Sequence, residues 1–215
     1  MNAVSAVAWK EWRGFLHDRR LNGALFFLVL IMSVYMPWQA GGPTLLVGPL
    51  IAVFAGSYLL TWTAFNGERL SKTLTSLLAG PLGMGDIFLG KIAAVTLATY
   101  LLGLLGMALS VAVVWLRFDA VPSGQVLLAA LVTLPVWGIV LSQLLGMTYM
   151  LFSNPFVLRL LMILLLTLVL GIGTGWQPTG FVLPSQAALI GAGAVLVVLL
   201  FFLAGRLDKE RVARG

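Results

Sequence analysis

Three residues in the middle of the chain have the spacing of a phosphate-binding loop. Gly85, Gly90 and Lys91 match the first part of the GxxxxGK[ST] pattern, in which backbone amides and a lysine hold nucleotide phosphates. The next position should carry a Ser or Thr hydroxyl for magnesium, and Ile92 stands there instead. No strand is expected before these residues, and a membrane span follows them. We therefore interpret Gly90 and Lys91 as the start of that span, with the Lys91 ammonium among the lipid headgroups.

Other reactive side chains are scarce. The chain has no cysteine and one histidine, His17, so thiol chemistry and Cys-based metal sites are excluded. The long apolar runs hold no ionisable side chain, which leaves no proton relay, ion-coordinating charge or carboxylate pair within a membrane. We expect His17 to be solvated, and we expect no catalytic residue, metal site or bound cofactor in this chain.

The composition is that of a membrane protein. Apolar residues make up 60% of the chain and charged residues 9%, against roughly 25% charged in a soluble domain. At about 1.5 Å per residue, six runs without charge can cross, or nearly cross, a hydrocarbon core roughly 30 Å thick. These runs are residues 21–38, 44–65, 92–116, 126–152, 160–176 and 182–205. The sequence thus predicts an all-α polytopic membrane protein with six transmembrane helices, forming one transmembrane domain over residues 1–215.

The basic residues predict the orientation. Six spans place both termini on one side of the membrane. Of the 13 Lys and Arg residues, all but Arg117 then lie on that side, which the positive-inside rule assigns to the cytoplasm. The net charge of +6 follows from this topology, so no nucleic-acid partner is expected. The predicted location is the cell inner (plasma) membrane, with both termini cytoplasmic.

Residues 1–20 predict an amphipathic helix that lies in the membrane interface and turns into the first span. Apolar side chains recur at helical spacing, with charged side chains between them. Tryptophan suits the headgroup region. The stretch that combines aromatic, basic and acidic side chains is Trp9, Lys10, Glu11, Trp12 and Arg13.

Residues 66–91, which we call the 66–91 segment, predict a second amphipathic helix between spans two and three. An apolar stripe recurs at i, i+4, i+7, i+8 and i+11, formed by Leu70, Leu74, Leu77, Leu78 and Pro81. Arg69 and Lys72 fall off this stripe, and the proline ends the helix. Such a helix either docks on a soluble partner or lies flat on the lipid headgroups, and the pattern alone favours neither.

The order of residues in this segment resembles a known family. The resemblance is carried by Glu68, Arg69, Thr73, Leu74, Leu77, Leu78, Pro81, Leu82, Asp86, Gly90 and Lys91. They follow the pattern E-x(4)-T-L-x-x-L-L-x-x-P-L-x(3)-[ED]-x(3)-G-K, found between the second and third spans of type-2 ABC exporter permeases. Family members often have Gly where this chain has Lys72. Their connection between the last two spans is also often longer.

The resemblance implies the membrane-spanning subunit of an ATP-binding cassette exporter, without a catalytic site of its own. ATP and magnesium would be bound by a cytoplasmic ATPase subunit, and a second permease copy or a paralogue would complete the translocation pathway. The matching residues would contact the ATPase through a coupling helix, with the N-terminal helix packed beside it. Candidate residues of the pathway are Ser57, Thr61 and Trp137, of which the last follows Pro135 in a span that we expect to kink.

Two alternatives remain. One is the haem-exporter-type permease of cytochrome c maturation, which is similar in length and number of spans. The other is an ATP-independent membrane scaffold or channel, which has no need of the ordered motif. The spans carry no charged group that selects a cargo, so the transported substrate does not follow from the sequence.

Overall fold

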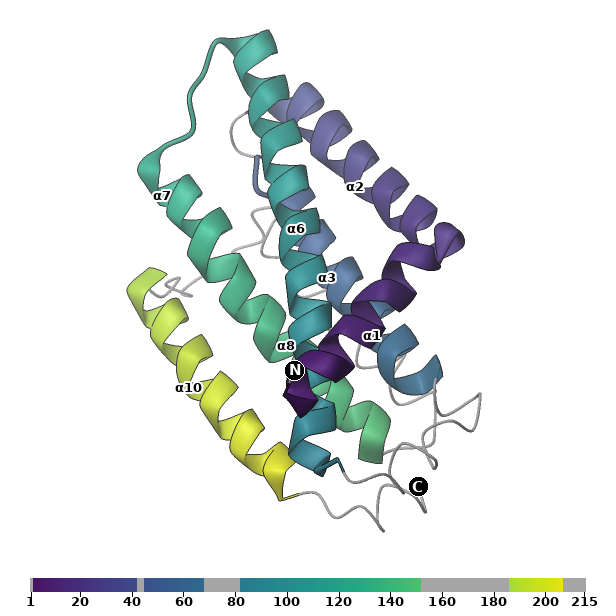
Figure 1. The fold of residues 1–215 in the computed structure, drawn as a ribbon. Coiled ribbons are helices and arrows are strands. Elements are labelled where there is room, and N and C mark those ends of the chain that lie inside the picture. Colours follow the sequence, from purple (N-terminus) through teal and green to yellow (C-terminus); the bar gives the residue numbers. More distant parts are fainter. Residues whose placement is uncertain (1, 42–44, 68–81, 152–185, 207–215) are drawn as a thin grey trace.

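The structure is a computed structural model that describes residues 2–41, 45–67, 82–151 and 186–206. All regular structure in these residues is helical, which confirms the predicted all-α class for them (Figure 1). The helices are α1 (Ala3–His17), α2 (Arg19–Ala40), α3 (Val47–Thr61), α6 (Met84–Phe118), α7 (Gly124–Leu128), α8 (Leu134–Leu151) and α10 (Gln186–Gly205). Two π-helical turns extend them: η2 (Trp62–Asn66) follows α3, and η3 (Ala129–Thr133) joins α7 to α8.

Five helical runs in the described residues are long and apolar enough to cross a membrane. They are Arg19–Gln39, Val47–Asn66, Met84–Phe118, Gly124–Met150 and Gln186–Gly205. Each overlaps one predicted span, so the chain is a helical multi-pass membrane protein. The predicted span at 160–176 lies outside the described residues, and the number of six spans stays a prediction.

Helix α1 lies across one end of the bundle rather than along it (Figure 1). The turn into α2 is held by side chains: Asp18 ends α1, and its carboxylate accepts a hydrogen bond from the Leu21 amide at 3.0 Å. The Asn22 side-chain amide donates to the Phe15 carbonyl at 2.7 Å. These bonds satisfy backbone groups that a helix end leaves free, so the angle between α1 and α2 is fixed locally.

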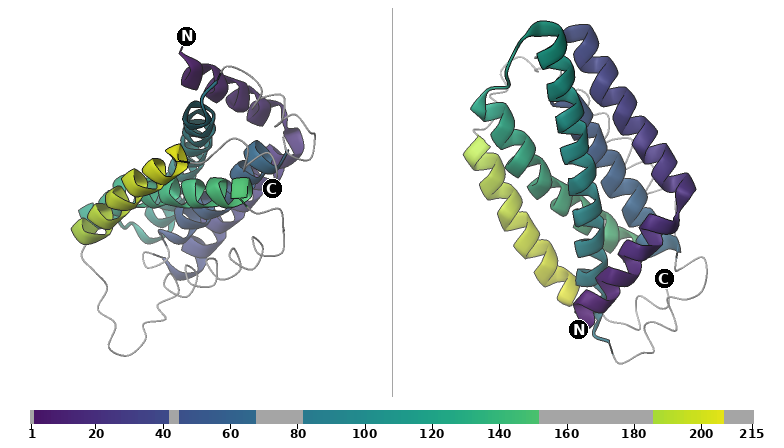
Figure 2. Two further views of the ribbon diagram at one scale, coloured as in Figure 1. Left: turned by 90° about the horizontal axis from the view of Figure 1, so that it is seen from below. Right: turned by 45° about the horizontal axis from the view of Figure 1, so that its top comes forward.

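Helix α6 is the centre of the molecule. It packs against α1, α2, α3, α8 and α10, and the views from two sides place it among them (Figures 1 and 2). Its 35 residues extend about 52 Å at 1.5 Å per residue, well beyond a hydrocarbon core of roughly 30 Å. One end of α6 therefore has room to project from the membrane.

Helix α6 begins before the predicted third span. The charge-free run predicted a span from residue 92, whereas the helix begins at Met84. Residues 84–91, which the sequence assigned to the 66–91 segment, thus belong to the same helix as the predicted third span. Asp86 does not stop the helix because its carboxylate accepts a hydrogen bond from the Gly83 amide at 3.3 Å, near the helix N-terminus.

The fourth span contains the irregularity that Pro135 predicts. The π-helical turn η3 lies immediately before α8, and Pro135 is the second residue of α8. A proline lacks an N–H and its ring crowds the carbonyl four residues earlier, which here is Leu131 inside η3. A wider turn at that place relieves the clash without ending the helix.

Candidate functional site

A fully buried ammonium group lies where α1 crosses α6. Lys91 of α6 is 0% exposed, and its Nζ lies 2.7 Å from Oε1 of Glu11 on α1. The same Nζ donates a hydrogen bond to the Ala64 carbonyl of η2 and lies 5.5 Å from the centre of the Phe65 ring. Three elements far apart in the sequence therefore meet at one cation.

The burial of this charge makes its partners necessary. Moving an ammonium out of water costs several kcal/mol, and a carboxylate at hydrogen-bond distance with a further acceptor offsets that cost. The Glu11 side chain is itself only 10% exposed. The Lys10 ammonium lies 3.9 Å from the same carboxylate, but its side chain is 56% exposed, so water screens that contact.

The local sequence explains why Glu11 faces inward. Val7, Glu11 and Phe15 are the buried residues of α1, and their spacing of four places them on one helix face. The α6 side of the contact is a glycine. A Cβ built on Gly90 would stand 2.6 Å from the Val7 Cβ and 2.8 Å from the Val4 carbonyl oxygen. Only a residue without a side chain permits α1 to approach α6 this closely.

The predicted position of Lys91 was therefore wrong. The sequence placed its ammonium among the lipid headgroups, and the structure buries it between α1, η2 and α6. The prediction failed because it treated a lysine at a span boundary as solvated, without a carboxylate on another element. The geometry also differs from a phosphate-binding loop, because residues 85–92 are helical and the Lys91 ammonium has protein partners.

The other residues of the N-terminal aromatic and charged stretch lie around this pair. Trp9 is 51% exposed, and the Arg13 guanidinium lies 5.1 Å from the centre of its ring. Lys10 and Arg13 are exposed, and Trp12 is half-buried. Glu11 is thus the buried member of the predicted interfacial set.

The predicted ATPase-contact residues fall into two groups. Asp86, Gly90 and Lys91 lie in the first turns of α6 and are described above. Those outside the described residues are Glu68, Arg69, Thr73, Leu74, Leu77, Leu78 and Pro81.

The predicted pathway residues lie between helices. The Ser57 hydroxyl of α3 donates to the Gly138 carbonyl of α8 at 3.4 Å, and therefore bonds to a neighbouring helix rather than to its own. Thr61 is also fully buried. Trp137 is half-buried beside α10, where a Cβ on Gly193 would lie 3.7 Å from its Nε1.

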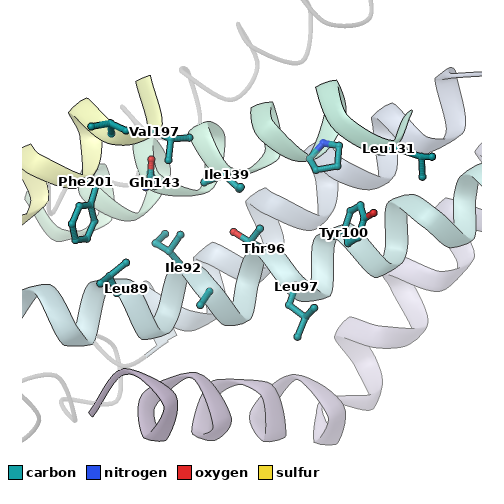
Figure 3. Close-up of a pocket in the computed structure, with 13 residues that line it drawn as sticks. Leu89, Ile92, Thr96, Leu97, Tyr100, Leu131, Ile139, Gln143, Val197 and Phe201 are labelled. Carbon is teal, nitrogen blue, oxygen red and sulfur yellow. The ribbon is translucent and has the colours of Figure 1, made fainter. Parts of the chain in front are cut away.

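A separate pocket of about 780 Å³ opens between α6, α8 and α10, and Figure 3 shows its lining. None of the predicted pathway residues lines it. Its wall is almost entirely apolar, with Thr96 and Tyr100 from α6 and Gln143 from α8 as polar members. Gln143 is 3% exposed, and its Oε1 has no hydrogen-bond partner in the described residues. Gln143 is an uncharged amide in a long apolar run, and the sequence analysis did not include it among the candidate pathway residues.

The described residues contain no group of three or more His, Cys, Asp or Glu side chains that could hold a metal ion. No protein-family model matches the chain, and no curated protein is similar to it. The case for a function therefore depends on the geometry above and on the motif of the 66–91 segment.

Proposed function

We propose that this chain is the membrane-spanning subunit of an ATP-driven exporter of the type-2 ABC permease kind. The observation that carries the proposal is the ordered motif from Glu68 to Lys91, which begins after the helical run Val47–Asn66 and ends in the first turns of Met84–Phe118. The leucine stripe within it, Leu74, Leu77 and Leu78, would seat in the ATPase subunit. Binding and hydrolysis of MgATP would take place in that partner, and this chain would have no catalytic residue.

The distribution of charge supports this arrangement. The described Lys and Arg residues other than Arg117 lie toward one end of the bundle, on α1, at the start of α2, in the first turns of α6 and after α10 (Figure 1). By the positive-inside rule that end faces the cytoplasm, where an ATPase binds. We call it the basic end. The membrane would be the cell inner membrane, and a second copy or a paralogue would complete the pathway.

The test is co-purification of the ATPase partner with variants of the leucine stripe. Truncating a buried interface anchor costs about 2 kcal/mol or more, which is roughly thirtyfold in affinity. We therefore expect Leu77→Ala with Leu78→Ala to lose the partner while the amount of folded chain in the membrane stays the same. Arg69→Ala is the matched control, because an exposed rim charge contributes at most about 1 kcal/mol.

Two outcomes contradict the proposal. If the wild-type chain retains no ATPase subunit, the chain is a scaffold or a channel that works without ATP. If the double leucine variant keeps the partner and Arg69→Ala loses it, the leucine stripe lies on lipid.

A further inference from the structure

We propose that Glu11 and Lys91 are positioning residues that fasten α1, the end of the second span and the start of the third into one unit. This inference rests on the proposed function, because the unit would receive motion from the ATPase through the 66–91 segment. It assigns Lys91 a role different from the one that the motif implies. A side chain that is 0% exposed within the chain is not a contact residue of the ATPase.

The first step is the bond between Lys91 and Ala64. Lys91 is the last residue of the 66–91 segment, and Ala64 stands two positions before its first residue. The hydrogen bond from the Lys91 Nζ to the Ala64 carbonyl oxygen therefore ties together the two helices that the segment connects. Two helices joined in this way cannot move apart at these positions without breaking the bond.

The second step adds α1. Glu11 binds the same ammonium at 2.7 Å, so α1 is attached to the pair of helices by a buried ion pair. Gly90, one residue earlier in α6, allows Val7 of α1 into contact at the same crossing. The charged contact and the apolar contact lie side by side, so tilting α1 away from α6 would break both.

The third step concerns why the contact between α1 and α6 uses an ion pair rather than two apolar side chains. A buried ion pair is weak support for stability, because apolar residues of similar volume often do as well or better. What the ion pair adds is directional hydrogen bonding, because the lysine ammonium has several N–H donors and a methionine side chain in its place has none. An apolar pair could hold α1 on α6, but it could not hold the Ala64 carbonyl. We therefore assign the pair to positioning the end of η2 and the start of α6, between which residues 68–81 lie.

The first measurement is hydrogen exchange on the purified chain without any partner. In Lys91→Met the Glu11 carboxylate stays buried and loses the ammonium 2.7 Å away, so we expect α1 amides to exchange faster by about tenfold or more. Lys10→Met is the matched control, because it removes an equal charge that lies near the same carboxylate but is exposed. We expect it to leave α1 exchange unchanged, and α10 is the internal reference in both variants. Unchanged α1 exchange in Lys91→Met overturns the proposal.

The second measurement separates positioning from stability. Glu11→Met with Lys91→Met removes both charges, so we expect thermal stability and slow α1 exchange to return. Spin labels at Gly67→Cys and Gly85→Cys report the distance across the segment, and a Cβ at either site meets no described atom within 4 Å. The chain has no native cysteine, so labelling is specific. We expect a narrow distance distribution with Lys91, a broad one in the double variant, and a narrow one again in Lys91→Arg, which keeps the donors.

The ATPase partner gives a third readout. Because the ends of the segment are released, we expect the double variant to bind the partner more weakly by about tenfold, at wild-type thermal stability. A double variant with a narrow distance distribution and full affinity overturns the proposal and leaves a purely structural pair. Failure of the proposed function appears differently: the wild-type chain binds no ATPase, while the exchange and distance results stand.

Discussion

Helix α6 carries a cation near each of its ends, and the two are held in different ways. Lys91, near the start, is fully buried against a carboxylate of α1 and a carbonyl of η2. Arg117, near the end, is exposed; it donates to the Trp38 carbonyl and lies 4.4 Å from the centre of the Trp38 ring. The two contacts on α6 thus allow a buried cation to be compared with an exposed one.

The difference lies in what each cation requires of the rest of the chain. Arg117 can exchange its protein contacts for water, so its removal leaves nothing unsatisfied. Lys91 and Glu11 are buried, so removing either one takes a charged partner at 2.7 Å from the other without replacing it by water. The basic end of the bundle is therefore specified by an interaction between residues 80 positions apart, whereas the opposite end does not depend on Arg117.

The largest effect is expected from breaking the buried pair on its anionic side. Glu11→Leu removes the carboxylate that lies 2.7 Å from the buried Lys91 ammonium, which should cost about 3 kcal/mol. The counterpart at the opposite end is Trp38→Leu, which removes an exposed cation–π contact valued at about 0.5–1 kcal/mol. The measurement is the fraction of chain that stays monodisperse after heating in detergent. Equal losses in the two variants would remove the distinction between the ends.

The next effect concerns glycines, which permit close helix contacts at both ends. Gly90→Ala places a Cβ 2.6 Å from the Val7 Cβ, and Gly48→Ala places one 2.6 Å from the Ser33 Cα. Each should cost about 1–3 kcal/mol through overpacking. Gly85→Ala is the matched control in α6, because its Cβ meets nothing within 4 Å.

Hydrogen exchange measured helix by helix distinguishes the effects of the two glycine variants. Gly90→Ala should speed hydrogen exchange of α1, and Gly48→Ala should speed that of α2 and α3 without affecting α1. Loss of α1 protection in Gly48→Ala would mean that the two ends are one cooperative unit, contrary to the argument above.

The spans were predictable because a backbone within lipid can satisfy its hydrogen-bonding groups in few conformations. Without water to bond, an apolar run of this length must satisfy its amides internally as a helix, and the charge-free runs located the described spans. The charge-free run did not locate the start of α6, because Asp86 caps the helix through the Gly83 amide and Lys91 has a partner 80 positions away that no local pattern reveals. The sequence does contain a hint: Glu11 interrupts the stripe of Val7 and Phe15, where a carboxylate needs a cation. Which cation it finds depends on the crossing of α1 over α6.

The smallest effect is expected at Arg117. Arg117→Gln removes the bond to the Trp38 carbonyl near the end of α2, at a cost of at most about 1 kcal/mol. A cysteine at Gln39, an exposed position beside Trp38, should react with an impermeant thiol reagent added outside intact cells. The rate of this reaction should rise by no more than about fivefold in Arg117→Gln, which corresponds to that free energy.

A cysteine at Val121, 82% exposed and distant in sequence from Trp38, controls for access to the membrane surface. A much larger increase would show that Arg117 holds α2 as firmly as Lys91 holds α1. If Gln39→Cys reacts only after the cells are opened, the orientation inferred from the basic residues is inverted.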